Sequence, residues 1–240
     1  SFAPARPAET GSLVQNAIQA ITGHIRSSGL RVGDSLPGEA HFAAELGVSR
    51  AVMREAFGAL AALRLVDVGN GRKPRVGAID GSVIAASLDH AVNTAQITVP
   101  EVWDVRRTIE RRTAALAATE RTEAEAQEIL ALAEAMADTG QDRAVLTKLD
   151  IAFHQAIARA SHNALFVQIV ASFAQLMEVA VPAAWETRTT ADQRVDILER
   201  HRALARAIQA RDPDAAIAAI DNHFDASIGE VLKRAPSQRG

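Results

Sequence analysis

The chain has 240 residues, of which 48% are hydrophobic and 23% charged, and it has a formal net charge of −3 and no cysteine. This composition is typical of a globular protein with a buried core and excludes a disordered chain. The lack of cysteine excludes disulfides, thiolate metal sites and cysteine nucleophiles.

The charge is spread unevenly along the chain. Residues 1–77 contain nine Lys and Arg against six Asp and Glu, whereas the remainder contains 17 against 23. A basic N-terminal segment ahead of an acidic remainder indicates that the first part binds a polyanion. We find no apolar run long enough to span a bilayer and no apolar core of a signal peptide, so we predict a cytoplasmic protein with no membrane partner.

The N-terminal part is expected to begin with a flexible arm over 1–9 and to continue as short helices separated by turns. Gly47 fits a helix C-terminus and Ser49 is a good N-cap for the helix that follows. The stretch "LVDVGNGRKPRVGA" combines two short β-type runs with a turn rich in Gly, Asn and Pro. Helices are predicted over 11–28, 39–46 and 50–63. This order predicts a winged helix-turn-helix domain over 1–77 with a small β-hairpin wing.

From residue 79 onward the apolar spacing is helical throughout. Caps and turns are well placed, because Thr122 with Glu125 can form a capping box and Asp212 with Pro213 supplies an N-cap and a first helical residue. Seven helices are predicted, over 79–93, 100–119, 122–139, 142–160, 163–181, 187–210 and 213–234. Short links between them favour an all-α antiparallel bundle over 78–240, so the chain as a whole is mainly α.

The start of the helix over 50–63 carries candidate DNA-contacting residues. The N-terminus of a recognition helix presents side chains and free N–H groups to phosphates and base edges, and Arg50 and Arg54 are four positions apart. A basic hairpin tip can reach the backbone or the minor groove. The alternative is a small helical subdomain whose arginines are only solvated. The predicted DNA-binding residues are Ser49, Arg50, Ala51, Arg54, Asn70, Gly71, Arg72 and Lys73.

These residues resemble the N-terminal winged helix of GntR-type bacterial transcription regulators. The family pattern runs G-x-x-L-P-x-E, then V-S-R, then R-E-A, and it is matched here at Gly33, Leu36, Pro37, Glu39, Val48 to Arg50 and Arg54 to Ala56. One position departs from the pattern: the family usually has a DNA-contacting arginine directly after the glutamate, and here that position is Ala40. The resemblance implies a homodimer that binds a near-palindromic double-stranded DNA operator.

A second group of polar residues lies in apolar surroundings of the predicted bundle. Asp150 and His154 are four positions apart and share one helix face. His201 and His223 lie about ten residues before and after the turn near 210–213, so on two antiparallel helices they stand at about the same height. Three imidazoles and a carboxylate that converge inside a bundle suit a divalent transition metal. The alternative is a hydrogen-bonded structural pair of Asp150 and His154.

The same region resembles the FCD effector domain of the FadR branch of GntR regulators. The resemblance implies that Asp150, His154, His201 and His223 bind the ion, with zinc as the first candidate and nickel and manganese as alternatives. It also implies that Arg106, in "EVWDVRRTIE", contacts the carboxylate of an effector. The alternative for Arg106 is a structural ion pair with Glu110 at i+4, and Arg107 is the weaker candidate for the effector contact.

Together with these resemblances, the sequence predicts a transcription regulator that responds to a small organic acid bound beside a metal, and the family resemblance implies a repressor. A metal-dependent hydrolase or lyase with the same Asp and three His is an alternative of another class, but the sequence shows no obvious general base for it. A regulator whose metal is purely structural, or which senses the metal itself, is the third alternative.

Overall fold

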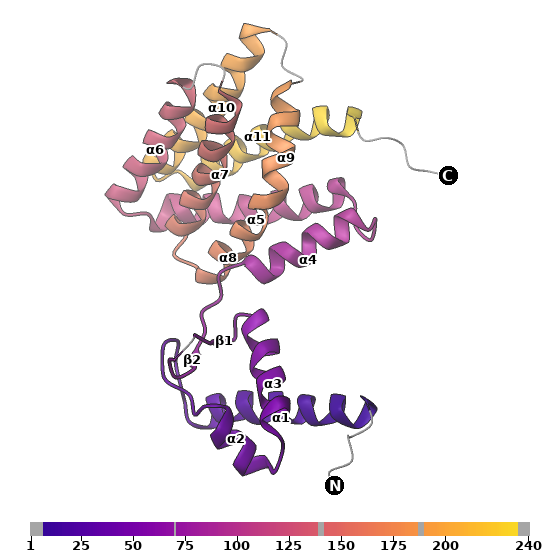
Figure 1. Cartoon of the computed structure of the whole chain (residues 1–240). Coiled ribbons are helices and arrows are strands. Elements are labelled where there is room, and N and C mark those ends of the chain that lie inside the picture. The colour runs from indigo at the N-terminus through magenta and orange to yellow at the C-terminus, as the bar shows by residue number, and fades with distance from the viewer. Residues whose placement is uncertain (1–6, 70, 139–141, 187–189, 235–240) are drawn as a thin grey trace. The chain divides into compact units, whose positions relative to one another are not determined.

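The structure, a computed structural model, describes residues 7–69, 71–138, 142–186 and 190–234. The chain divides into two compact units, Ser1–Val83 and Ile84–Gly240. Each unit has its own hydrophobic core, and the elements of both are labelled in Figure 1. The mainly helical fold with one small hairpin confirms the predicted fold class.

The first unit contains three helices and a two-stranded antiparallel hairpin. Its elements are α1 (Pro7–Ser27), α2 (Glu39–Leu46), α3 (Arg50–Ala62), β1 (Val66–Asp67) and β2 (Arg75–Val76). In the hairpin Val66 pairs with Val76 and Asp67 with Arg75. α1 begins at Pro7, so residues 7–9, which were expected to end a flexible arm, are helical; a proline suits the first helical position because it lacks the N–H that would stay unpaired there.

The turn between α2 and α3 has the local features expected of a helix-turn-helix. Gly47 adopts a left-handed conformation with φ of 65°, which only glycine takes up without a steric cost. The Ser49 hydroxyl accepts a hydrogen bond from the Val52 N–H at 3.2 Å and caps α3. Behind the turn, Phe42 and Phe57 are both buried with ring centroids 6.1 Å apart, and this contact fixes the angle between the two helices.

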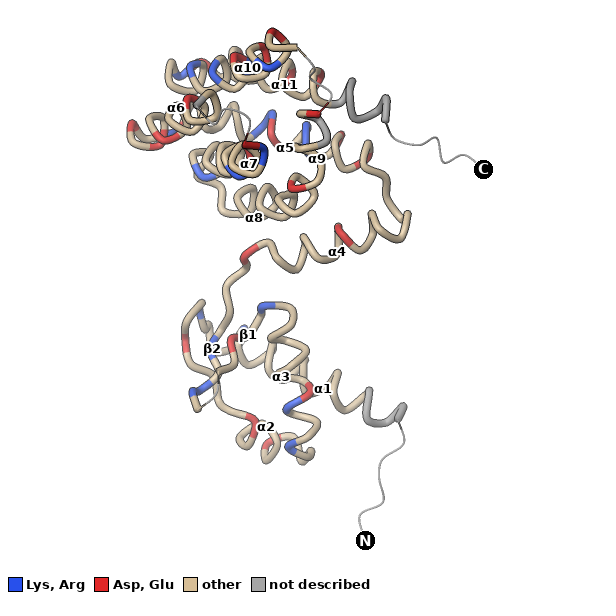
Figure 2. The backbone as a smooth tube through the Cα atoms, turned by 45° about the horizontal axis from the view of Figure 1, so that its top comes forward, with Lys and Arg blue, Asp and Glu red and all other residues tan. Residues whose placement is uncertain are grey.

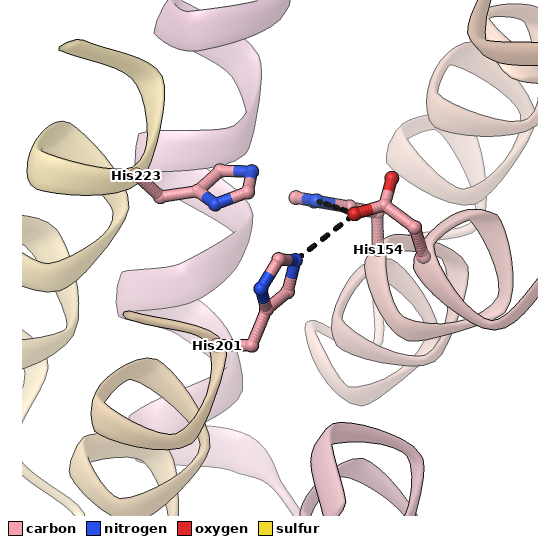
Figure 3. Close-up of side chains that lie close together, drawn as sticks. His154, His201 and His223 are labelled. Carbon is pink, nitrogen blue, oxygen red and sulfur yellow. Dashed lines mark hydrogen bonds and ion pairs between the residues drawn. The ribbon is translucent and has the colours of Figure 1, made fainter. Parts of the chain in front are cut away.

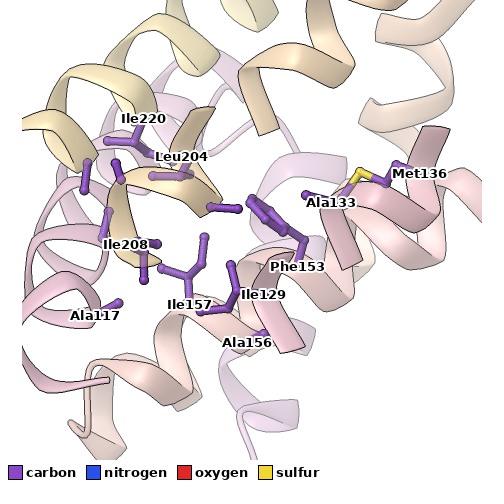
Figure 4. Packing of buried hydrophobic residues seen from close by; sticks show 14 of the residues in the cluster. Ala117, Ile129, Ala133, Met136, Phe153, Ala156, Ile157, Leu204, Ile208 and Ile220 are labelled. Atoms are coloured by element: carbon purple, nitrogen blue, oxygen red, sulfur yellow. The ribbon is translucent and has the colours of Figure 1, made fainter. Parts of the chain in front are cut away.

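The second unit is built almost entirely from helices. Its elements are α4 (Ser82–Asn93), α5 (Val99–Glu120), α6 (Glu123–Asp138), α7 (Arg143–Ala160), α8 (Ala164–Ser172), α9 (Ala174–Glu186), α10 (Ala191–Gln209) and α11 (Pro213–Arg234). Helix α5 packs against α7, α10 and α11, while α6 packs against α7 and α10. Figure 4 shows the core that these contacts enclose, with Phe153 and Ile157 of α7 facing Leu204 and Ile208 of α10.

The predicted helix over 163–181 is two helices in the structure. Helices α8 and α9 meet at Phe173 with a bend of 48°. The Ser172 hydroxyl donates to the carbonyl of Ile169, and the Phe173 N–H bonds to Val170 three residues back, so the α-helical hydrogen-bond pattern is interrupted there. No single helix in the described part of the chain has the length and apolar character to cross a membrane; only this bent pair passes such a test, by length and composition alone.

Candidate metal and effector site

Four side chains from three helices converge in the core of the second unit. Asp150 and His154 lie one turn apart on α7, His201 comes from α10 and His223 from α11, as Figure 3 shows for the three histidines. One potential ligand atom from each residue lies within 4.8 Å of all the others. An ion that binds ligands at about 2.0–2.2 Å spans at most about 4.4 Å between opposite ligands. The cluster can therefore hold one metal ion once the four ligand atoms move slightly closer together.

The turn between α10 and α11 brings His201 and His223 to the same height. Arg211 in that turn has a φ of 57°, and the Asp212 carboxylate accepts from the Ala215 N–H at 2.9 Å to start α11. The two helices then run antiparallel, and the ring centroids of His201 and His223 are 4.6 Å apart. His201 and His223 therefore lie at the same height on the two helices, as their equal distances from the turn predict.

The contacts of His201 require either a second proton on its ring or a metal ion at Nε2. Its Nδ1 lies 2.8 Å from the Ile197 carbonyl, which can only accept, so Nδ1 carries a proton. In the neutral imidazole Nε2 then has a lone pair, yet it lies 2.9 Å from Asp150 Oδ1, a second acceptor. Two acceptors at this distance repel unless a proton or a metal ion lies between or beside them.

His154 is oriented toward the cluster in the same way. Its Nδ1 lies 2.5 Å from Glu110 Oε2, and a carboxylate at this distance favours the tautomer that carries its proton on Nδ1. Nε2 is left with its lone pair, is buried, and has no hydrogen-bond partner among the described residues. The Nδ1 atom of His223 is buried and equally without a partner there. Buried ring nitrogens without partners are costly in a core and are the atoms that a metal ion would bind, so the residues fit the ion.

The electrostatics of the cluster favour the forms that bind metals. Burial raises the pKa of Asp150, but the hydrogen bond from His201 and the three nearby imidazoles outweigh it and hold this pKa below its ordinary value. Burial, together with the charges of His201 and His154, lowers the pKa of His223 well below 6.5. Asp150 is therefore an anion and His223 neutral near neutral pH, which are the states that bind a metal ion.

Glu110 joins this cluster to Arg106. The guanidinium Nε of Arg106 donates to Glu110 Oε1 at 2.6 Å, and both side chains are 3% exposed. Burial raises the pKa of Glu110, but the charges of Arg106 and His154 outweigh it and lower that pKa below 4.5. The structural ion pair considered from the sequence thus exists. The Glu110 carboxylate also orients the candidate metal ligand His154. The sequence did not predict this second contact, because the i+4 spacing indicates only the ion pair of Arg106 with Glu110.

A cavity adjoins the cluster on the side of Arg106. About 40 Å³ of it is open to the centres of water molecules, which is room for a few waters or a small ligand. Asp150, His201 and His223 line it together with Arg106, while apolar side chains such as Leu146, Val181 and Ile197 form much of the rest. Arg106 Nη1 donates to Met177 Sδ at 2.7 Å, a weak acceptor.

Arg107 lies elsewhere. Its guanidinium pairs with Asp221 at 3.0 Å and with Asp225 at 2.6 Å on α11, and its side chain is 30% exposed. The structure therefore places Arg106 and not Arg107 at the cavity.

The predicted DNA-binding residues lie on the surface of the first unit. Ser49, Arg50, Ala51 and Arg54 are exposed at the start of α3, and Arg54 Nε lies 3.7 Å from Glu39 Oε2. Gly71, Arg72 and Lys73 are exposed in the turn between the strands, whereas Asn70 is outside the described residues. Figure 2 shows the basic positions of α3 and of the hairpin along the backbone.

Comparisons with known proteins match each of the two units to a domain of bacterial transcription regulators. The model of the family described as bacterial regulatory proteins, gntR family, matches residues 13–76, and the model of the FCD domain matches 101–226. The Glc operon transcriptional activator of Escherichia coli is 30% identical over 200 residues, covering 81% of this chain and 79% of the relative. The galactonate operon transcriptional repressor of Escherichia coli is 27% identical, covering 77% and 81%. A solved structure of a Streptococcus agalactiae GntR protein has the same fold, with a TM-score of 0.64 and 22% identity over 92% of this chain and all of that one.

Proposed function

The chain belongs to the GntR family of bacterial regulatory proteins, in the branch that carries an FCD domain, and from this premise we propose that it senses a small carboxylate beside a bound metal ion. Like its relatives, it is a ligand-responsive DNA-binding transcription regulator. It is not an enzyme. We assign DNA binding to residues 1–77 and effector binding with dimerisation to residues 78–240. Because the DNA that bacterial regulators bind lies in the cytoplasm, we propose that the protein acts there.

Asp150, His154, His201 and His223 would hold the metal ion. Three imidazoles and one carboxylate suit zinc first, with nickel and manganese as alternatives. When bound, the ion would supply a positive centre that attracts an anionic ligand.

One observation carries the effector proposal: the candidate metal ligands and the Arg106 guanidinium line the same cavity. A guanidinium offers a planar fork that matches a carboxylate, and charge-assisted hydrogen bonds of this kind are short and strong. A carboxylate in the cavity would replace the weak sulfur contact of Arg106 with oxygen acceptors. We propose that this binding shifts the placement of the DNA-binding units within a homodimer and releases a near-palindromic operator.

Arg106→Lys tests the effector contact, because lysine keeps a cation for Glu110 and loses the fork. We expect the affinity of the metal-loaded protein for carboxylates such as lactate to fall about 10- to 100-fold, as for the loss of a charged hydrogen bond. Isothermal titration calorimetry measures the affinity and elemental analysis the metal content, which should not change. Arg107→Lys is the matched control and should bind like the wild type. Unchanged affinity in Arg106→Lys would contradict the assignment of Arg106, and an absence of carboxylate binding in the wild type would favour a structural or directly sensed metal.

Arg50→Ala tests the DNA contact at the start of α3. We expect operator affinity to fall about 5- to 100-fold, with a smaller dependence of binding on salt concentration if the contact includes a phosphate. Arg159→Ala is the control, because Arg159 is an exposed arginine of the second unit that pairs with Glu128. Fluorescence anisotropy with an operator duplex at several salt concentrations gives both affinities. Equal affinity of the two variants would contradict a role of Arg50 in recognition.

A further inference from the structure

Helix α9 forms one wall of the cavity but carries none of the candidate metal ligands. Met177, Ala180, Val181 and Trp185 line the cavity from α9, whereas the ligands come from α7, α10 and α11 and Arg106 comes from α5. Helix α5 packs directly against α7, α10 and α11, so the helices around the cluster are joined without α9. α9 can therefore move without separating the candidate ligands.

The backbone of α9 has two weak points. The chain bends by 48° at Phe173, where α8 meets α9. Pro182 lies inside α9, and because proline has no N–H, the carbonyl of Glu178 loses its helical hydrogen bond. Helices bend where such hydrogen bonds are missing. A movement of α9 relative to the bundle thus breaks few backbone hydrogen bonds.

The contacts of α9 with its neighbours include two weak polar ones. The Arg106 guanidinium donates to the sulfur of Met177, which is a poor acceptor. At the C-terminal end of α9, Glu186 pairs with Arg143 of α7 at 2.6 Å, with side chains 48% and 52% exposed. Solvent screens such a pair, so it contributes little. On the outer face of α9 the side chain of Val179 is 75% exposed.

The candidate metal ligands cannot be reached from solvent while α9 lies in this position. All four are less than a tenth exposed. Neighbouring side chains such as Phe153 and Leu204 belong to the close-packed core, which leaves no path through it. A metal ion or a ligand must therefore enter through the cavity, and a wall of the cavity must move to admit it.

We propose that α9 is the gate of this cavity and that the ion pair of Arg143 with Glu186 is the latch of the gate. The C-terminal end of α9 swings outward to admit a metal ion or a ligand, and the latch holds it closed. This proposal goes beyond the proposed function, because it concerns access to the cavity, whatever binds there. It gives Arg143 and Glu186 control over the rates of entry and release.

A single introduced thiol measures how often the gate opens. The chain has no cysteine, so Ser227→Cys places one thiol at a buried position of the cavity lining. Its labelling by a thiol-reactive dye in the metal-free full chain reports the opening. Adding Glu186→Gln, which removes the charge of the latch and keeps the shape, should raise the labelling rate about 2- to 5-fold, as for the loss of an exposed ion pair. The control is Glu128→Gln, which breaks a half-exposed pair with Arg159 and should leave the rate unchanged.

A covalent lock tests the gate in the opposite direction. Arg143→Cys with Glu186→Cys places two thiols at the latch, and a short bismaleimide bridges thiols that lie too far apart for a disulfide. The matched control is the same variant with each thiol capped by N-ethylmaleimide. Zinc is the probe, and we expect its transfer from the loaded protein to a coloured chelator to be at least 10-fold slower from the bridged form. Circular dichroism establishes that both forms are folded.

Three results would overturn the gate. The first is an equal labelling rate with and without Glu186→Gln, and the second is equal zinc transfer from the bridged and the capped protein. The third is a labelling rate that rises with denaturant as steeply as global unfolding does, because the swing of one helix exposes far less surface. In these cases zinc would still bind, and the proposed function would stand. If the protein binds no zinc, the proposed metal site fails, while thiol labelling still decides on the gate.

Discussion

Replacing Glu110 with alanine is expected to lower the free energy of unfolding of the second unit by about 3–5 kcal/mol. Glu110 contacts Arg106 and His154 inside the core, and all three side chains are nearly inaccessible. Alanine leaves the guanidinium buried without its anion, and an uncompensated buried charge is strongly destabilising. Chemical denaturation followed by circular dichroism measures the change.

A surface ion pair provides the control for this substitution. Glu128 lies 2.7 Å from Arg159 on the outside of the bundle, with its side chain half exposed. Solvent screens such pairs, so Glu128→Ala should cost less than about 1 kcal/mol. A similar small cost for Glu110→Ala would mean that water reaches Arg106 and that the buried ion pair does not stabilise the bundle.

Glu110→Gln separates the stabilising role of Glu110 from its role toward the metal. Glutamine has nearly the same shape, but an amide that accepts from Arg106 through its oxygen presents N–H groups to His154 Nδ1. The imidazole proton then has no acceptor, and the tautomer that aims Nε2 at the cluster is no longer favoured. Loss of such an outer hydrogen bond typically weakens metal binding about 10- to 100-fold.

Replacing His201 with alanine is expected to weaken metal binding by more than about 100-fold, since a direct ligand contributes more than an outer partner. In the wild type a metal at 100 times its dissociation constant stabilises the fold by about 2.7 kcal/mol, so chelation should lower the unfolding midpoint. The variant should unfold at the same temperature with and without added zinc. Thermal unfolding with and without a chelator measures both effects.

His90→Ala is the control for the loss of a histidine. His90 is exposed on α4 and is not part of the four-residue cluster. This variant should bind metal and respond to the chelator like the wild type. If His201→Ala retained the metal response, the ion would bind elsewhere and the cluster would be a set of structural hydrogen bonds.

Much of the fold and the four candidate metal ligands were predictable from residue patterns. The caps at Ser49, Thr122 and Asp212 set helix starts locally, because a side-chain oxygen satisfies an N–H of its own first turn. The break at Phe173 escaped prediction because an unbroken apolar pattern over 163–181 looks the same whether the helix is straight or bent.

The sequence by itself determined the two-part organisation, the helix-turn-helix with its basic surface, and the four candidate metal ligands. These follow from spacing along single helices and from equal distances to one turn, which are local properties of the chain. Only the tertiary structure decided that Glu110 bridges Arg106 and His154, and that Trp103 keeps an unpaired N–H beside the same cavity. Those relations depend on how α5 packs against α7 and α11, and that packing is the summed result of many apolar contacts that no single motif encodes.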